Sequence, residues 1–359
     1  MNNTIDPIFE QIIKGNFANF EENFKKHLSN LYVGENALKD ITNWQKFFLG
    51  FTKFQQHTYQ RELSEPQTIW QEGSARMLQY KHCDNVPVVL FVPSLINKSY
   101  ILDLSRSKSM LRYLAKERLN INLLDWGEPC EEELDFGFDD YVHNRLCHAI
   151  NHLYSLYNKK IILVGYCLGG ILAIHSATLL NDKIERIALL ATPWDFTQLN
   201  FKFQHPSLAN ILVQFDKVPA ASIKNLFYLQ DFPRVFNKFI TFSELDPKCS
   251  QAKNFVAVER WVSDGISVSK KLMQEIYQKH IADSGAWSID PTKCKLPCLV
   301  VIPTNDRIAP PASTIALAKA LPNRQVIKIE AGHVGMIIGS GAKLHLWFVL
   351  KKWLLLRRT

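Results

Sequence analysis

The segment 161–180 constrains the fold of this chain more than any other part of the sequence. Residues 161–164 are all apolar and predict a short buried strand, and apolar residues at helical spacing predict a helix over 171–180. Between the two lies the turn Gly165-Tyr-Cys-Leu-Gly169. A strand, a tight turn and a helix in this order are typical of a nucleophile elbow, whose usual sequence is G-x-S-x-G.

Cys167 stands where the serine of such an elbow would be. The turn holds its central residue in a strained conformation, and Gly165 and Gly169 would prevent collisions between side chains and the neighbouring backbone. Cys167 would then project at the N-terminus of a helix, where the positive end of the dipole favours thiolate over thiol. A glycine-rich turn around a buried structural cysteine has the same pattern. The choice between a catalytic and a structural Cys167 therefore depends on the rest of the sequence.

Short apolar runs recur along the chain, with helical segments between them. Buried strands are predicted at 88–93, 121–125, 161–164, 187–191, 298–303 and 325–329. Helices are predicted to begin near Leu102 and to span about 138–157. Strands that alternate with helices form a parallel sheet with right-handed crossovers. The sequence therefore predicts the α/β class with a mostly parallel sheet in residues 76–196 and 291–359.

Two segments lie outside this alternation. Residues 1–75 are predicted to form a helical N-terminal extension, because apolar residues recur at helical spacing at Phe17, Phe20, Phe24, Leu28 and Leu31. Residues 197–290 are helical in character and rich in phenylalanine. An insertion after the strand 187–191, counted as the sixth core strand of an α/β-hydrolase, predicts a helical cap, whose aromatic residues would form its own core and enclose an apolar acyl pocket.

An acid and a histidine follow the last two predicted strands. Asp306 comes after the strand 298–303, and His333 comes after the strand 325–329. The order Cys167, Asp306, His333, with each residue at a strand end, is that of the α/β-hydrolase fold. In this interpretation His333 takes the thiol proton, Cys167 attacks a carbonyl carbon, and Asp306 orients and stabilises the imidazolium. The cap would then be inserted before the catalytic acid.

The oxyanion of an acyl-transfer intermediate needs backbone N–H donors. One is expected from Leu168, which follows the nucleophile, and the other from the loop 94–97, at Ile96 or Asn97. A loop aspartate or a loop histidine alone would carry no function, so the catalytic interpretation rests on the elbow, the acid and the histidine together.

Charge and cysteine content restrict the setting of the protein. The net charge of +8 suits an anionic partner, such as nucleic acid, a membrane surface or a phosphate-bearing substrate, although no nucleic-acid-binding module is recognisable. The seven cysteines are odd in number and widely spread, and no secretory signal is recognisable, which favours a reducing cytoplasm. Cys294-Lys-Leu-Pro-Cys298 is interpreted as two core thiols entering a strand. No apolar run reaches the ~18 residues of a membrane-spanning helix.

Beyond these features, the chain resembles the polyhydroxyalkanoate synthases over roughly residues 80–353. The resemblance is carried by Gly165-Tyr-Cys-Leu-Gly169, Pro93-Ser-Leu-Ile-Asn-Lys-Ser-Tyr-Ile-Leu-Asp-Leu104, Asp125-Trp-Gly-Glu-Pro129, Glu259-Arg-Trp-Val-Ser-Asp-Gly265, Asp306 and Gly332-His-Val-Gly-Met336. Two features depart from the family: Arg307 stands where a histidine usually follows the acid, and the N-terminus is shorter than in one-subunit synthases. The length resembles that of catalytic subunits that work with a second protein.

The resemblance implies polymerisation of (R)-3-hydroxyacyl-CoA, most often 3-hydroxybutyryl-CoA, through an acyl-Cys167 intermediate. Coenzyme A would be the leaving group, and neither a cofactor nor a metal would be needed. The implied partners are the acyl-CoA, the growing polyester chain and the granule surface, with no nucleic acid, in a cytoplasmic, granule-associated location. A homodimer and a second synthase subunit are left open.

Two rival functions fit parts of the same sequence. A hydrolase on this scaffold, such as an intracellular polyester depolymerase or a cysteine-type esterase like dienelactone hydrolase, would use the same three residues with water as the acceptor. The blocks at 93–104 and 259–265 favour the synthase. A catalytically silent granule-binding or scaffold protein is the second rival, and the intact Cys167, Asp306 and His333 argue against it.

Overall fold

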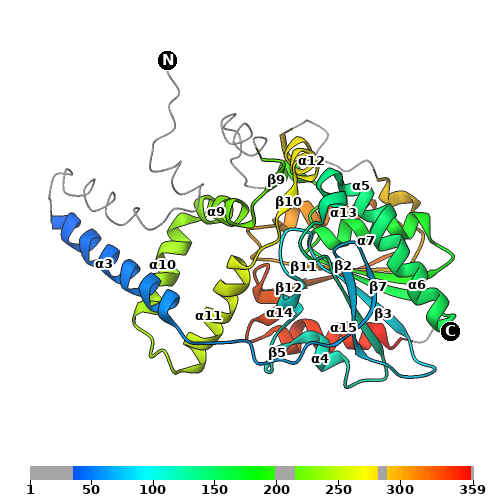
Figure 1. Cartoon of the computed structure of the whole chain (residues 1–359), viewed down its shortest axis with the longest axis horizontal. Helices are drawn as coiled ribbons and strands as arrows, with labels where there is room; N and C mark the ends of the chain where they lie inside the picture. Colours follow the sequence, from blue (N-terminus) through cyan, green and yellow to red (C-terminus); the bar gives the residue numbers. More distant parts are fainter. Residues whose placement is uncertain (1–34, 199–214, 282–288, 357–359) are drawn as a thin grey trace, which may run out of the picture. The chain divides into compact units, whose positions relative to one another are not determined.

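A computed structural model describes residues 35–198, 215–281 and 289–356 (Figure 1). Its central feature is an eight-stranded sheet with the strand order β1-β2-β6-β3-β7-β8-β11-β12. The strands are β1 (Gln67–Glu72), β2 (Ala75–Lys81), β3 (Val88–Val92), β6 (Asn120–Asp125), β7 (Ile161–Tyr166), β8 (Ile184–Leu190), β11 (Cys298–Pro303) and β12 (Arg324–Ile329).

The sheet is parallel from β6 to β12, while β1 and β2 pair antiparallel at one edge. All residues of β3, β6, β7 and β11 are buried, which explains why the sequence shows β3, β7 and β11 as runs of apolar residues and not as alternating patterns. The outer strand β12 is mostly exposed. The predicted α/β-hydrolase fold with a mostly parallel sheet is confirmed.

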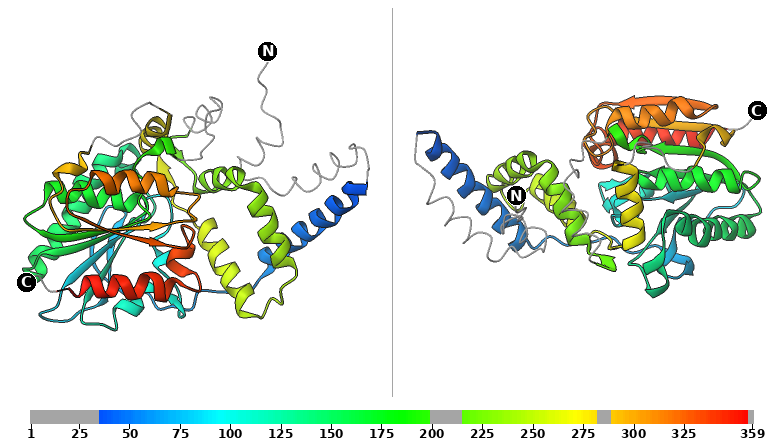
Figure 2. Two further views of the ribbon diagram at one scale, coloured as in Figure 1. Left: turned by 180° about the vertical axis from the view of Figure 1, so that it is seen from behind. Right: turned by 90° about the horizontal axis from the view of Figure 1, so that it is seen from above.

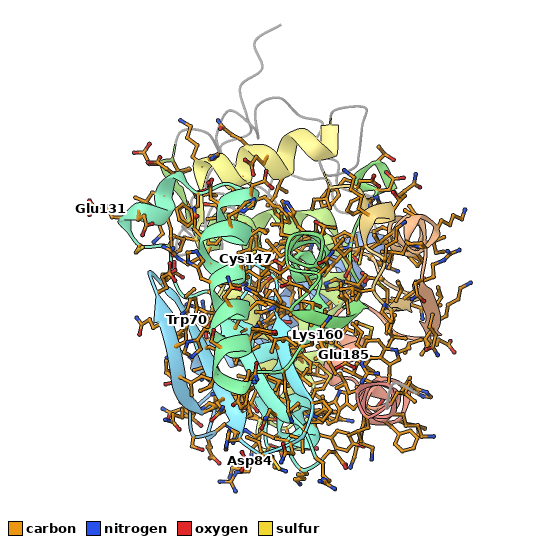
Figure 3. All side chains as sticks on the ribbon, turned by 90° about the vertical axis from the view of Figure 1, so that its right-hand side faces the viewer. Trp70, Asp84, Glu131, Cys147, Lys160 and Glu185 are labelled. Atoms are coloured by element: carbon orange, nitrogen blue, oxygen red, sulfur yellow. The ribbon has the colours of Figure 1, made fainter. Side chains whose placement is uncertain are left out.

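Helices cover both faces of this sheet (Figures 1 and 2). One face carries α4 (Met110–Leu114) and α15 (Phe348–Leu354), and the opposite face carries α6 (Cys147–Tyr157), α7 (Leu168–Leu179) and α13 (Pro311–Ala320). Figure 3 shows Cys147 on the helix that crosses in front of the strands and Trp70 on the outer strand β1. A helical turn α5 (Phe138–Tyr141) and a π-helical turn η4 (Val142–Leu146) precede α6, so the predicted helix at 138–157 is present with a local change of pitch.

The helix predicted from Leu102 begins later, at Met110. Residues Ser99–Leu102 form the 3-10 turn η2, and the short strands β4 (Asp103–Ser105) and β5 (Lys108–Ser109) follow. Ser109 caps α4, since its side chain accepts a hydrogen bond from the backbone N–H of Arg112 at 3.0 Å. The Arg112 side chain reaches back to the buried Asp103, so a tertiary ion pair replaces the first turns of the expected helix.

The described chain falls into two compact units, each built from two stretches of sequence. One contains residues 35–61 and 219–265, and the other contains the sheet and the rest of the described chain. The first unit consists of α3 (Glu35–Gln56), α9 (Ala220–Gln230), α10 (Phe232–Ser243) and α11 (Ser250–Ser263). Its core is aromatic: Phe239 of α10 is buried against the rings of Phe47, Phe51 and Phe54 from α3.

The two units divide the chain differently from the expected boundaries at 75, 197 and 290. The edge strand β1 lies inside the predicted helical extension 1–75, because its pairing with β2 was not visible as a run of apolar residues. The helix α12 (Lys270–Ile281) and the ladder of β9 (Lys217–Val218) with β10 (Val268–Ser269) belong to the sheet unit. The phenylalanines and leucines at 17–31 lie outside the described residues, and the role of 197–290 as a cap stays a prediction.

The motif Glu259-Arg-Trp has a packing role within the helical unit. Glu259 is buried and accepts hydrogen bonds from the hydroxyl of Tyr228 at 2.8 Å and from Nζ of Lys238 at 2.7 and 2.8 Å. The neighbouring Arg260 donates to the backbone carbonyls of His57 and Tyr59, just after α3. Among the helices that the structure describes, none has the length and apolar character needed to cross a membrane.

Candidate active site

Cys167 lies between β7 and α7 in a backbone conformation that is rare for a residue with a side chain. Its φ of 55° and ψ of −128° are outside the regions that suit L-amino acids. The strain is held from both sides, since the N–H of Cys167 donates to the carbonyl of Leu190 at 2.9 Å and its own carbonyl accepts from Gly170. The predicted strand–turn–helix elbow is therefore present.

The two predicted elbow glycines are required by close backbone contacts. A Cβ atom at Gly165 would collide with the backbone of Gly170, and one at Gly169 would collide with the carbonyl groups of Val92 and Pro93. The elbow is thus packed against the end of the neighbouring strand β3, where only glycine leaves enough room.

Asp306 and His333 meet after the ends of β11 and β12. His333 Nδ1 lies 2.6 Å from Asp306 Oδ2, and both side chains are buried. The other carboxylate oxygen, Oδ1, accepts the backbone N–H groups of Ile308 at 2.8 Å and Ala309 at 2.9 Å. These bonds fix the carboxylate in a single orientation. His333 is therefore held with Nδ1 facing the acid and with Nε2 available for another partner.

The electrostatic environment of His333 favours its protonated form. Burial lowers the pKa of His333, but the negative charges of Asp306 and Cys167, together with hydrogen bonds to both side chains, outweigh burial and raise the pKa to about 10. The structure thus brings Cys167, Asp306 and His333 together. The imidazolium that these charges and hydrogen bonds stabilise is the form that His333 would take after removing the proton of Cys167.

The predicted oxyanion donors lie on two adjacent strand ends. Leu168 is the first residue of α7, and the first backbone N–H groups of a helix have no partner within the helix. Ile96 and Asn97 lie in the loop after β3, which pairs in parallel with β7 through Val92 and Gly165. The carbonyl of Ile96 accepts the N–H of Ile266 at 3.2 Å. The use of Leu168, Ile96 and Asn97 by an oxyanion stays a prediction.

Tyr166 and Arg307 each stand next to a predicted site residue in the sequence. Tyr166 was not predicted, although it stands directly before Cys167 in the elbow: its ring lies 5.1 Å from that of His333, and its hydroxyl donates to the His333 carbonyl at 3.3 Å. Burial, then the charges of Cys167 and Asp306, raise the pKa of Tyr166 well above its ordinary value. Arg307, in place of the histidine usual in the resembling family, is exposed.

Family models match two overlapping parts of the chain. A model described as "alpha/beta hydrolase fold" matches residues 87–340, and a model described as "Poly-beta-hydroxybutyrate polymerase (PhaC) N-terminus" matches residues 8–114. The first match includes the candidate site and covers more than half of the chain.

Curated relatives cover most of the chain at low identity. The "Poly(3-hydroxyalkanoate) polymerase subunit PhaC" of Haloferax mediterranei is 26% identical over 310 residues, which are 80% of this chain and 63% of that subunit. The chain thus spans less than two thirds of that relative. The subunit of the same name from Synechocystis sp. is 23% identical over 351 residues, covering 89% of this chain and 93% of that subunit.

Solved structures share the fold at lower identity. A protein of Acinetobacter baumannii AYE described as a lipase (lip1) superposes with a TM-score of 0.51 and 15% identity, covering 90% of this chain and 98% of that one. This likeness concerns the fold alone.

Proposed function

Since the chain belongs to the α/β-hydrolase fold family and is homologous to poly(3-hydroxyalkanoate) polymerase subunits, we propose that it polymerises (R)-3-hydroxyacyl-CoA into polyester. The observation that carries the proposal is the strained elbow with a thiol, Cys167, beside the hydrogen-bonded pair His333 and Asp306. The proposed substrate is 3-hydroxybutyryl-CoA or a close homologue, and free CoA is the leaving group.

The first step of the proposed reaction loads the enzyme. His333 takes the proton of Cys167, and the thiolate attacks the thioester carbonyl carbon. The resulting oxyanion accepts hydrogen bonds from Leu168 and from the loop that carries Ile96 and Asn97. Collapse of the intermediate breaks the bond to the CoA sulfur, and His333 returns its proton to the departing thiolate. Because one thioester replaces another, the step is nearly balanced in energy and the acyl group stays reactive.

The second step forms the ester bond. The 3-hydroxyl group of another acyl unit attacks the carbonyl carbon of acyl-Cys167, while His333, oriented by Asp306, accepts the hydroxyl proton. The bond to the Cys167 sulfur breaks and the thiolate recovers the proton from His333. Each cycle releases one CoA and lengthens the chain by one unit. Attack by water on the same acyl-enzyme would instead give a hydroxyacid, which distinguishes a hydrolase from a synthase.

The protein's partners and location belong to the same proposal. The curated relatives are named polymerase subunits, which supports testing this chain with and without a second subunit and as a homodimer. A growing polyester chain and a granule surface in the cytoplasm are the proposed setting, with no cofactor, metal or nucleic acid taking part.

The first experiment uses the purified protein with (R)-3-hydroxybutyryl-CoA and follows free thiol release and the product. Release of CoA with insoluble polyester supports the synthase, whereas release with only free hydroxyacid supports a thioesterase. Butyryl-CoA, which lacks the 3-hydroxyl group, should leave a butyryl adduct on Cys167 that mass spectrometry detects. If the protein neither released CoA nor formed this adduct, the proposed role of Cys167 as the nucleophile would be contradicted.

Two alanine variants make the test specific for the elbow cysteine. Cys167→Ala should abolish CoA release and the adduct, because the nucleophilic sulfur is gone. Cys147→Ala is the matched control, since Cys147 and Cys167 have the same exposure of 7% but Cys147 lies on α6. Turnover by Cys167→Ala above background would exclude the proposed role.

A further inference from the structure

The loop 93–99 connects β3 to η2 and carries Ile96 and Asn97. If these residues donate backbone N–H groups to an oxyanion, the loop must be held at a fixed distance from the elbow. An irregular loop lacks the full ladder of backbone hydrogen bonds that sets the positions of N–H groups in a strand or helix. Its position therefore has to come from side chains of other elements.

The start of this loop is held by Trp126. The indole Nε1–H of Trp126 donates to the carbonyl of Pro93 at 3.1 Å, and the Trp126 side chain is buried. The same Pro93 carbonyl lies directly against Gly169, where a Cβ atom would collide with it. Trp126 thus holds the loop at the point where the loop touches the elbow, two residues after Cys167.

The end of the loop is held by the residue that precedes Trp126. Ser99 Oγ donates to Asp125 Oδ1 at 3.0 Å, and both side chains are buried. Lys98 Nζ lies 3.5 Å from a carboxylate oxygen of Glu128, three residues farther along. The segment 125–128, which begins at the last residue of β6, therefore contacts both the first and the last residues of the loop.

Asp125 and Trp126 are themselves anchored to the antiparallel edge of the sheet. The second carboxylate oxygen of Asp125, Oδ2, accepts from Arg76 Nε at 3.0 Å and lies 2.9 Å from Arg76 Nη2. The backbone carbonyl of Trp126 accepts the hydroxyl of Ser74 at 2.6 Å. One oxygen of Asp125 thus faces the scaffold while the other faces the loop, so the carboxylate links β2 to Ser99.

We propose that Asp125 and Trp126 are positioning residues that hold the loop 93–99 where its backbone N–H groups stabilise the oxyanion formed at Cys167. This inference rests on the proposed acyl-transfer chemistry but not on the identity of the acyl acceptor. It assigns a function to the motif Asp125-Trp-Gly-Glu-Pro129, which the sequence marks without explaining. A merely structural role would predict a general loss of stability and no selective effect on acylation.

Two reactions of the same sulfur separate these alternatives. Acylation of Cys167 by p-nitrophenyl butyrate passes through an oxyanion, while alkylation by iodoacetamide attacks a saturated carbon and forms none. The release of p-nitrophenolate measures acylation, and mass spectrometry of the peptide that contains Cys167 measures alkylation. Neither assay needs CoA or polymer, so the inference stays testable if the polymerase function fails.

The variants remove one loop contact at a time. Trp126→Phe keeps a ring and loses the bond to Pro93, and Ser99→Ala loses the bond to Asp125. We expect each to slow acylation about tenfold to a hundredfold and to leave alkylation within about twofold of the wild type. Ser99→Thr, which keeps a hydroxyl group, should restore most of the acylation rate.

Matched controls remove similar groups elsewhere in the sheet unit. Trp347→Phe loses a buried indole bond of 2.9 Å to the carbonyl of Ile337, and Ser105→Ala loses a buried hydroxyl with no hydrogen-bond partner among the described residues. Both should acylate like the wild type. Equal slowing of acylation and alkylation in Trp126→Phe and Ser99→Ala, or no slowing of either, would overturn the inference. The inference would also be overturned if Cys167 of the wild-type protein were alkylated by iodoacetamide but never acylated by p-nitrophenyl butyrate.

Discussion

Asp306 uses its two carboxylate oxygens for different purposes. Oδ1 is held by two backbone N–H groups, and Oδ2 lies 2.6 Å from His333 Nδ1. The acid is therefore oriented by its own loop before it acts on the imidazole. The backbone bonds to Oδ1 thus leave Oδ2 to face the imidazole of His333.

Asp306→Asn should impair chain elongation more than loading of Cys167. Asparagine keeps an oxygen for the N–H groups of Ile308 and Ala309, but it loses the negative charge that stabilises protonated His333. Elongation requires His333 to remove a proton from a poorly acidic hydroxyl group, so we expect it to fall by about a hundredfold or more. Adduct formation from butyryl-CoA measures loading, and steady-state CoA release from 3-hydroxybutyryl-CoA measures elongation. Equal losses would indicate that Asp306 only orients His333.

The raised pKa of His333 predicts how its contribution to stability depends on pH. The pKa is about 10 in the folded protein, against an ordinary value of 6.5. Protonated His333 therefore stabilises the fold fully below about pH 6.5, and this contribution is lost as the pH rises through about 10. Relative to the wild type, His333→Gln should lose the most unfolding free energy near pH 6 and progressively less toward pH 10. Urea unfolding at several pH values measures this, and a constant difference would contradict the assigned charge state.

At the scale of elements, the helical unit depends on the close approach of α3 and α10. A Cβ atom at Gly50 of α3 would collide with the carbonyl of Phe239 on α10. The glycine thus lets the backbones of the two helices touch, and the rings of Phe47 and Phe51 pack on either side. The requirement for glycine at this position could not be recognised from helical periodicity, because it depends on the partner helix.

Gly50→Ala should destabilise the helical unit although alanine is the better helix former. Helix propensity favours alanine by about 1 kcal/mol, but the collision with a fixed backbone carbonyl costs more, about 1–3 kcal/mol in overpacked interiors. We expect a net loss in unfolding free energy, measured by urea unfolding with circular dichroism. Gly335→Ala is the control, since a Cβ there meets no atom within 4 Å. A stabilised Gly50→Ala variant would show that the two helices do not approach so closely in solution.

At the scale of the whole molecule, the net charge of +8 would favour capture of the proposed anionic substrate. A positively charged protein attracts an anionic acyl-CoA, and salt weakens this attraction at separations beyond about 10 Å at 0.1 M ionic strength. We expect kcat/KM for 3-hydroxybutyryl-CoA to fall about threefold or more between low salt and ~0.5 M salt. The uncharged p-nitrophenyl butyrate should show no such dependence. Parallel salt dependences for both substrates would indicate that the charge has no part in binding CoA.

The residues of the candidate site and the positions of the central strands along the chain were predictable because both depend on local patterns. The strands β7 and β11 are buried on both faces, so they are visible as apolar runs, and Cys167 and Asp306 follow them. His333 follows the outer strand β12, which is mostly exposed but contains Val326, Ile327 and Ile329. The antiparallel edge was missed because β1 is half exposed and lacks such a run. The start of α4 was misplaced because Arg112 pairs with Asp103, a contact that no local pattern reveals.

The sequence by itself determined that the chain forms a parallel α/β sheet with a cysteine elbow, since glycine spacing and apolar runs express backbone sterics and burial directly. Only the tertiary structure decided that Trp126 and Asp125 bracket the loop 93–99 and that α3 shares a core with α10. Those contacts join residues far apart in the chain. Their free energy depends on distances and orientations that exist only once the strands and helices have packed.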